Sequence, residues 1–185
     1  MARDAQQQHY DPGLDRGGET LLSLYERLPG LPASSVPWRV RLLENPSSPC
    51  ALPGAVDLFS HDCVHLLLGR GLLPQDEAFV LGFTMGTNPR CAEWHVRLFC
   101  WCARHLYQGD YRFSETDTEV FRFAVAAARR SRAALLEAVD FHAWLERPLR
   151  QVRAALGIEP GYLRRVYAAE AARWPGTVVS RRLPR

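Results

Sequence analysis

The sequence contains no lysine, so all 23 of its basic residues are arginine, and 20 acidic residues bring the net charge to +3. We attribute the missing lysine to genome composition. A net charge this small gives no reason to expect a nucleic acid partner, because nucleic-acid-binding domains usually carry a strong basic excess. The 185-residue chain also lacks a hydrophobic run near the roughly 18 residues that mark a membrane span. We do not expect its polar first residues to be a signal peptide.

Cysteine is scarce and follows no pairing pattern. The chain has five cysteines, an odd number with no CxxC pair among them. Secreted disulfide scaffolds use regularly spaced, even sets of cysteines, so we expect a reducing compartment. We therefore expect a cytoplasmic protein that can also associate peripherally with a membrane surface.

Patterns typical of β-strands are also rare. Only short runs such as residues 38–43 alternate as a strand would, and the proline-rich segments 28–40 and 44–54 leave little room for a sheet. From residue 55 onward the apolar spacing is helical and predicts six helices. They lie near residues 55–68, 74–85, 90–107, 116–136, 140–156 and 160–173. We therefore predict an all-α fold.

The length and composition fit one domain. With 47% hydrophobic and 23% charged residues, the chain matches an average globular protein and not a disordered one. We expect a single compact multi-helix domain at residues 18–175, because single domains usually hold roughly 100–200 residues. Residues 1–17 are expected to be a mobile tail, and residues 176–185 a C-terminal tail.

Several of these helices carry signals for their ends. Asn88-Pro89 provides a capping side chain before a proline, and Thr116 with Glu119 has the spacing of a capping box. Pro74 precedes acidic residues that favour a first turn. Gly157 lies where the helix at 140–156 should end.

The most informative residues are two histidines and two carboxylates between residues 61 and 77. His61 and His65 are four residues apart, so a helix presents them on one face, and Asp62 lies three residues before His65. The helix should end at Gly69, and a short turn makes the next helix its neighbour. Glu77, about one turn into that helix, should then lie level with His65.

Two imidazoles and two carboxylates that converge in this way predict a site for a divalent metal. Zinc is the first choice from this ligand set, and iron, manganese or magnesium are alternatives. Apolar residues of the same helix pair would hold a hydrophobic tail beside the metal. The candidates for this lipid-binding role are Phe59, Leu66, Phe79, Val80 and Phe83.

The pattern His61-Asp62-x-x-His65, followed by eleven residues and Glu77, resembles the HDxxH-x11-E metal motif of the coenzyme Q (ubiquinone) biosynthesis protein four family. A second similarity covers residues 141–160, which resemble the closing helix of that family with its leucine-glycine-isoleucine ending. Together the two similarities suggest the family across residues 38–160. The chain is shorter at its N-terminal end, and glycines interrupt residues 79–87, so we regard it as a divergent short member.

The resemblance implies an all-α fold, a bound divalent metal, an isoprenoid-tailed ligand and peripheral membrane association. It also implies decarboxylation with hydroxylation at C1 of a polyprenyl-hydroxybenzoate ring. Carried over residue by residue, the metal ligands would be His61, Asp62, His65 and Glu77, with Asp62 either a fourth ligand or the group that orients an imidazole.

Two other functions agree with the same residues. A non-catalytic prenyl-lipid-binding or scaffolding protein could use the metal to hold the phosphate of a prenyl phosphate. Whichever function applies, the chain could form a homodimer. An HD-type metal phosphohydrolase would need a further upstream histidine, and only His9 precedes the motif. Outside the site, we expect Trp94, Trp101, Trp144 and Trp174 to lie in the core, although a membrane-facing helix also uses such rings.

Overall fold

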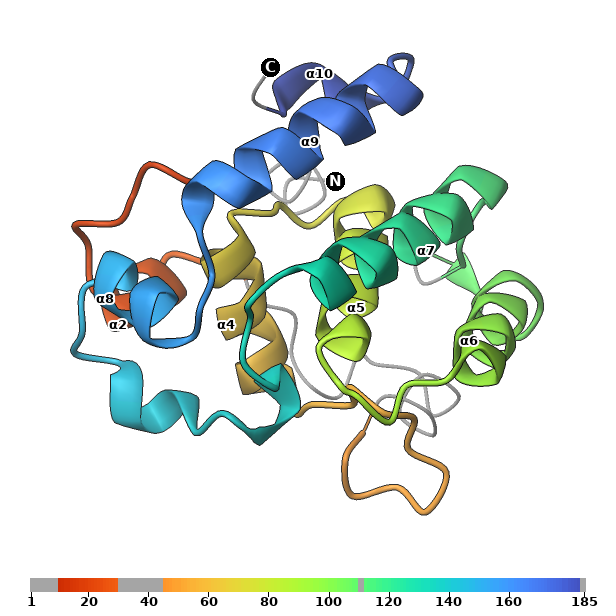
Figure 1. Ribbon diagram of the computed structural model, residues 1–185, viewed down its shortest axis with the longest axis horizontal. Coiled ribbons are helices and arrows are strands. Elements are labelled where there is room, and N and C mark those ends of the chain that lie inside the picture. The colour runs from red at the N-terminus through yellow and green to blue at the C-terminus, as the bar shows by residue number, and fades with distance from the viewer. Residues whose placement is uncertain (1–9, 30–44, 110–111, 184–185) are drawn as a thin grey trace.

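The computed structural model describes residues 10–29, 45–109 and 112–183, and within these ranges the chain is helical with no strand (Figure 1). The α-helices are α2 (Leu21–Tyr25), α4 (Leu58–Leu68), α5 (Pro74–Gly86), α6 (Glu93–His105), α7 (Glu115–Arg130), α8 (Leu149–Ala155), α9 (Pro160–Arg173) and α10 (Val178–Arg182). Two short 3₁₀ helices, η3 (Leu136–Ala138) and η4 (Phe141–Trp144), connect α7 to α8. The predicted all-α fold is confirmed. The alternating run at 38–43 lies outside the described residues.

Helix α5 lies in the middle of the molecule, and α7 crosses closely over it (Figure 1). Two glycines of α5 permit this approach. A Cβ atom at Gly82 would lie 2.3 Å from the carbonyl oxygen of Phe121, and one at Gly86 would lie 2.6 Å from that of Val125. The glycines that interrupt residues 79–87 are therefore the surface on which α7 packs.

Most predicted helices are present, and local hydrogen bonds explain where their starts differ. Helix α4 begins at Leu58 rather than at 55, because the side chain of Asp57 caps it by accepting a hydrogen bond from the Ser60 amide at 2.9 Å. The expected cap at Asn88 is wrong: its side chain accepts from the Arg90 amide at 2.8 Å and closes a turn. Helix α6 starts only at Glu93.

Two expected helices are shorter than their apolar spacing suggested. Helix α7 begins with a capping box of Ser114 and Asp117, not of Thr116, and ends at Arg130 because Ser131 is extended. The helix expected at 140–156 is split, since Pro148 has no amide hydrogen to continue a helix and α8 starts only after it. Gly157 ends α8 with a positive φ of 67°, as predicted.

Both segments expected to be tails pack against the body where the structure describes them. Leu14 is buried, and its carbonyl oxygen accepts a hydrogen bond from Arg153 at 2.7 Å. At the other end, α10 forms within residues 176–185 and buries Val179, while Leu183 follows it into the core. The expectation of tails rests on polar composition, and composition does not reveal the single apolar residues that anchor a segment.

None of the helices in the described part of the chain is long and apolar enough to cross a membrane.

Candidate metal centre

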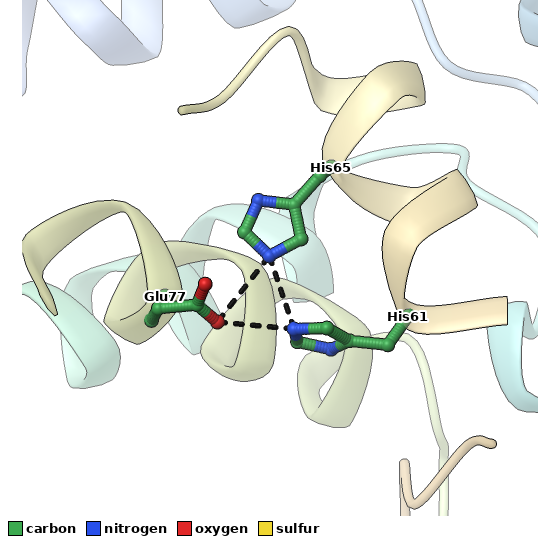
Figure 2. A group of neighbouring side chains, drawn as sticks. All are labelled: His61, His65 and Glu77. Atoms are coloured by element: carbon green, nitrogen blue, oxygen red, sulfur yellow. Dashed lines mark hydrogen bonds and ion pairs between the residues drawn. The ribbon is translucent and has the colours of Figure 1, made fainter. Parts of the chain in front are cut away.

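Three side chains from two neighbouring helices converge on one point. His61 and His65 project from α4 and Glu77 projects from the first turn of α5 (Figure 2). Helix α4 ends where Gly69 adopts the left-handed conformation, at φ 66°, and α5 begins at Pro74 after a short turn. The turn brings the end of α4 level with the start of α5, as the residue spacing predicted.

The distances within this group fit a single metal ion. The Nε2 atoms of His61 and His65 lie 3.0 Å apart, and Glu77 Oε2 lies 3.0 Å from the first and 3.3 Å from the second. Atoms that each lie about 2.0–2.1 Å from one zinc ion are separated by roughly 2.9–3.4 Å at bond angles between about 90° and 109°. In the described residues, these three form a group able to hold a metal.

The tautomer of His65 is set by a backbone contact. Its Nδ1 lies 2.8 Å from the carbonyl oxygen of Gly71, an acceptor, so this nitrogen carries the hydrogen and donates it. The lone pair of a neutral His65 is then on Nε2, which faces His61 and Glu77. This arrangement, in which the second imidazole nitrogen donates to an oxygen, is typical of metal-ligating histidines.

The group is closed on one side and open on the other. The side chain of His65 is fully buried, whereas 17% of His61 and 30% of Glu77 remain exposed. Burial alone would raise the pKa of the Glu77 carboxyl, but the electrostatic effect of the adjacent His65 and His61 rings outweighs burial and holds that pKa well below its usual range. Glu77 is therefore an anion at neutral pH, and one face of the group is accessible to water or to another molecule.

Asp62 lies outside this group of three, although the sequence placed it among the ligands. Burial raises the pKa of its carboxyl, while the neighbouring His61 and His65 act in the opposite direction. The next residue, Cys63, is buried, and burial raises the pKa of its thiol to about 12. Cys63 does not belong to the group of His61, His65 and Glu77 either.

The C-terminal end of α4 is held by side chains from the last third of the chain. The guanidinium of Arg153 donates to the carbonyl oxygens of Leu66 at 3.1 Å and Leu67 at 2.8 Å, and the hydroxyl of Tyr167 donates to that of Leu68 at 2.5 Å. The last carbonyls of a helix have no partner within the helix. Because α8 and α9 satisfy them, the helix that carries both histidines has a fixed end.

The turn between α4 and α5 is anchored by a buried ion pair. Arg70 donates two hydrogen bonds to Glu170 of α9, at 2.9 and 3.0 Å, and its Nε lies 3.1 Å from Asp76. The guanidinium also lies 4.4 Å from the centre of the Phe79 ring. Arg70 precedes Gly71, so this network fixes the peptide whose carbonyl oxygen orients His65.

The residues proposed to bind a lipid tail are mostly in the core. Leu66, Phe79 and Val80 are fully buried, and Phe79 packs against Phe83 and the edge of Tyr167. Phe83 lines a cavity of about 300 Å³ that also contacts residues of α9. Phe59 is half-buried and stacks on His142, with ring centres 4.2 Å apart.

Gly71 and Arg70 support the site without a sequence pattern that marks either of them as part of it. Gly71 acts through its backbone carbonyl, which no side-chain pattern reports. Arg70 depends on Glu170, a residue 100 positions away in the chain. The Gly-Arg-Gly turn was the one available signal, and it indicated only where the helix ends.

No protein-family model matches the chain, and neither a curated protein nor a solved structure matches it. The similarity to the coenzyme Q biosynthesis protein four family therefore rests on the motif residues and their spacing.

Proposed function

We propose that this protein is a metal-dependent enzyme whose divalent ion is held by His61, His65 and Glu77. The observation that supports this most directly is the spacing of the three ligand atoms, 3.0–3.3 Å, with His65 already oriented by a backbone acceptor. Zinc is the expected ion and iron, manganese or magnesium are alternatives, since two imidazoles and a carboxylate suit several of these metals.

The arrangement suits catalysis better than a purely structural role, because structural zinc sites are usually closed by four protein ligands. A metal with positions open to solvent can polarise a bound carboxylate or phenol oxygen of a substrate. The remaining roles would belong to the three side chains that hold the metal. Glu77 supplies the negative charge, buried His65 is held in one orientation, and the exposed side of His61 and Glu77 admits the substrate.

The substrate class comes from the resemblance of the motif. We propose a prenylated aromatic acid, a polyprenyl-hydroxybenzoate, whose C1 carboxylate leaves as carbon dioxide while a hydroxyl group takes its place. This replacement is a two-electron oxidation, so it requires dioxygen, which would take up the electron pair and leave as hydrogen peroxide while water supplies the hydroxyl oxygen. The apolar tail would need space beside the site. Phe59 is half-buried and lies near the start of α4, two residues before His61, so it is the candidate lipid contact that a tail can reach without opening the core.

Elemental analysis of the protein purified without added metal tests the site. We expect about one divalent ion per chain in the wild type, and its loss in His65→Ala and in Glu77→Gln. Circular dichroism should show that both variants keep their helices. His105→Ala and Glu146→Gln, at exposed positions outside the group, serve as controls and should keep the metal. Variants that retain the metal, or a wild type that takes up none on titration, would refute the proposal.

The proposed reaction is tested separately from metal binding. A polyprenyl-hydroxybenzoate labelled at its carboxyl carbon should release labelled carbon dioxide with the wild type and not with Glu77→Gln. A metal-loaded protein that binds the prenylated acid without converting it would contradict the enzymatic role. That result would support the lipid-binding or scaffolding function instead.

A further inference from the structure

Helix α6 presents an apolar stripe to solvent. Trp94 and Trp101 are 60% and 54% exposed, and Leu98 lies between them, also exposed. Residues at these spacings share one face of a helix. Leu106, the residue that ends the helix, adds a fourth exposed apolar side chain. The two tryptophans were expected in the core, and the structure corrects that expectation.

The stripe cannot be buried by a rotation of α6, because the opposite face already lies in the core. Val96, Phe99 and Ala103 are buried there, and Phe99 stacks on Phe121 of α7 with ring centres 4.4 Å apart. Helix α6 lies at the edge of the molecule, so its outer side is not covered by another described helix (Figure 1). Exposed tryptophan and leucine side chains that cluster on one helix face typically mark an interaction surface.

A basic hollow lies beside the stripe, between α6 and α7. It has a volume of about 290 Å³, and three arginines line it together with the ring of Trp101. No carboxylate lines this hollow among the described residues. The complete lining consists of Arg97, Cys100, Trp101, Arg104, His105, Thr118 and Arg122.

We propose that this face of α6 docks on a bilayer of anionic phospholipid. Trp94, Leu98 and Trp101 would enter the interfacial region, where tryptophan is favoured, and a headgroup phosphate would occupy the arginine hollow. Basic residues at the edge of an apolar helix face are typical of helices that lie in the plane of a membrane surface.

The charge of this face favours an anionic membrane over a second copy of the chain as its binding partner. A symmetric dimer through this face would enclose the basic hollows of both copies in one interface, and the described residues that line the hollow offer no carboxylate to balance that charge. An anionic membrane instead supplies the missing negative charge. These residues lie outside the two motif segments, 61–77 and 141–160, on which the family resemblance rests, and the docking does not depend on a bound metal.

Vesicle cosedimentation tests the surface directly. We expect the full chain to sediment with vesicles of phosphatidylcholine and phosphatidylglycerol and to remain in solution with phosphatidylcholine alone. Arg97→Gln with Arg104→Gln should lower the partition coefficient about thirtyfold, equivalent to about 2 kcal/mol for two basic residues near a charged membrane. Both tryptophans remain in this variant, so the blue shift of their fluorescence on anionic vesicles should disappear with binding.

Matched variants keep the test specific. Arg147→Gln removes an exposed arginine elsewhere, and Val178→Ala shortens an exposed apolar residue on α10; both should bind like the wild type. Trp94→Ala with Trp101→Ala should lose binding while keeping a native circular dichroism spectrum. Equal loss in the controls, or no preference for anionic vesicles, overturns the proposal. So does a change of oligomeric state in the tryptophan variant, or tighter binding of a single-stranded oligonucleotide than of vesicles.

Discussion

At the scale of single residues, the candidate site depends on which atom of each side chain faces the proposed metal position. His65 has one orientation because Gly71 accepts the hydrogen of its Nδ1 and the whole ring is buried. His61 and Glu77 are partly exposed, and their positions follow from mutual contacts at 3.0 Å. Among the proposed ligands, His65 is therefore the one whose position depends most on the surrounding structure.

Asp62 is expected to support the proposed metal ligands without binding the metal itself. Because it lies outside the group of His61, His65 and Glu77, we expect Asp62→Asn to keep its metal at full stoichiometry. The metal affinity should fall by no more than roughly tenfold to hundredfold, the effect of removing a group that supports ligands. Titration with a competing chelator measures this, with His65→Ala as the metal-free reference. An Asp62→Asn protein purified without metal would show that Asp62 is itself a ligand.

At the scale of helices, the close crossing of α5 and α7 holds Glu77 in place. The crossing is possible because Gly82 and Gly86 lie four residues apart and expose the backbone of α5 to the carbonyl groups of α7. Ala124 and Ala128 are the small residues that α7 contributes at the same contact. A residue with a larger side chain at either glycine would push α7 away from the helix that carries Glu77.

Gly82→Ala tests this packing. The added methyl group would meet the Phe121 carbonyl oxygen, so we expect a loss of about 1–3 kcal/mol in the free energy of unfolding. Gly161→Ala in α9 is the matched control, because its Cβ would have 3.9 Å of space to the nearest atom, Arg165 Nη1. The control should be neutral or stabilising by up to about 1 kcal/mol, since alanine is the better helix former. Chemical denaturation measures both, and equal values for the two variants would show that α5 and α7 do not constrain each other.

At the scale of the whole molecule, residues distant in sequence hold the two helices of the candidate site. Arg70 in the turn pairs with Glu170 in α9, and Gln75 of α5 donates to the same carboxylate at 2.7 Å. Arg182, beyond α9, contacts Asp76 in the first turn of α5. The last two helices therefore contribute no metal ligand but determine where the turn and the start of α5 lie.

The variant Glu170→Gln tests how much the buried ion pair with Arg70 matters for the stability of the fold. Arg70 would remain a buried cation without its main partner, so we expect a loss of about 3–5 kcal/mol in the free energy of unfolding. Replacement of both partners by apolar residues, Arg70→Met with Glu170→Leu, should recover part of that stability, because it leaves no unpaired buried charge. Thermal denaturation compares the variants. A double variant as unstable as the single one would mean that the pair is needed for more than charge balance.

Much of the fold could be predicted because its signals are local. The bounds of α9, the start of α5 at Pro74 and the end of α4 at Gly69 follow from proline and glycine at helix ends. The pairing of His61 with His65 needs only the geometry of one helix. The approach of Glu77 needs, in addition, only a short turn between neighbouring helices.

The expectations that were wrong concern features that depend on packing between distant segments, which the local sequence does not report. Helix α6 has apolar residues on two opposite faces, and only packing against α7 decides that Phe99 is buried while Trp94 and Trp101 are exposed. Composition marked the glycines of α5 as an irregularity, whereas their role depends on α7, about 40 residues later in the chain.

The helical fold and the convergence of two histidines and a glutamate could be predicted from the sequence, because both depend on apolar periodicity and on contacts across one short turn. The tertiary structure alone decided which carboxylate joins the group, which oxygen orients His65, and which face of α6 meets solvent. Those outcomes depend on atoms that come together from distant parts of the chain, where burial and hydrogen bonding select one arrangement among several that the local pattern permits.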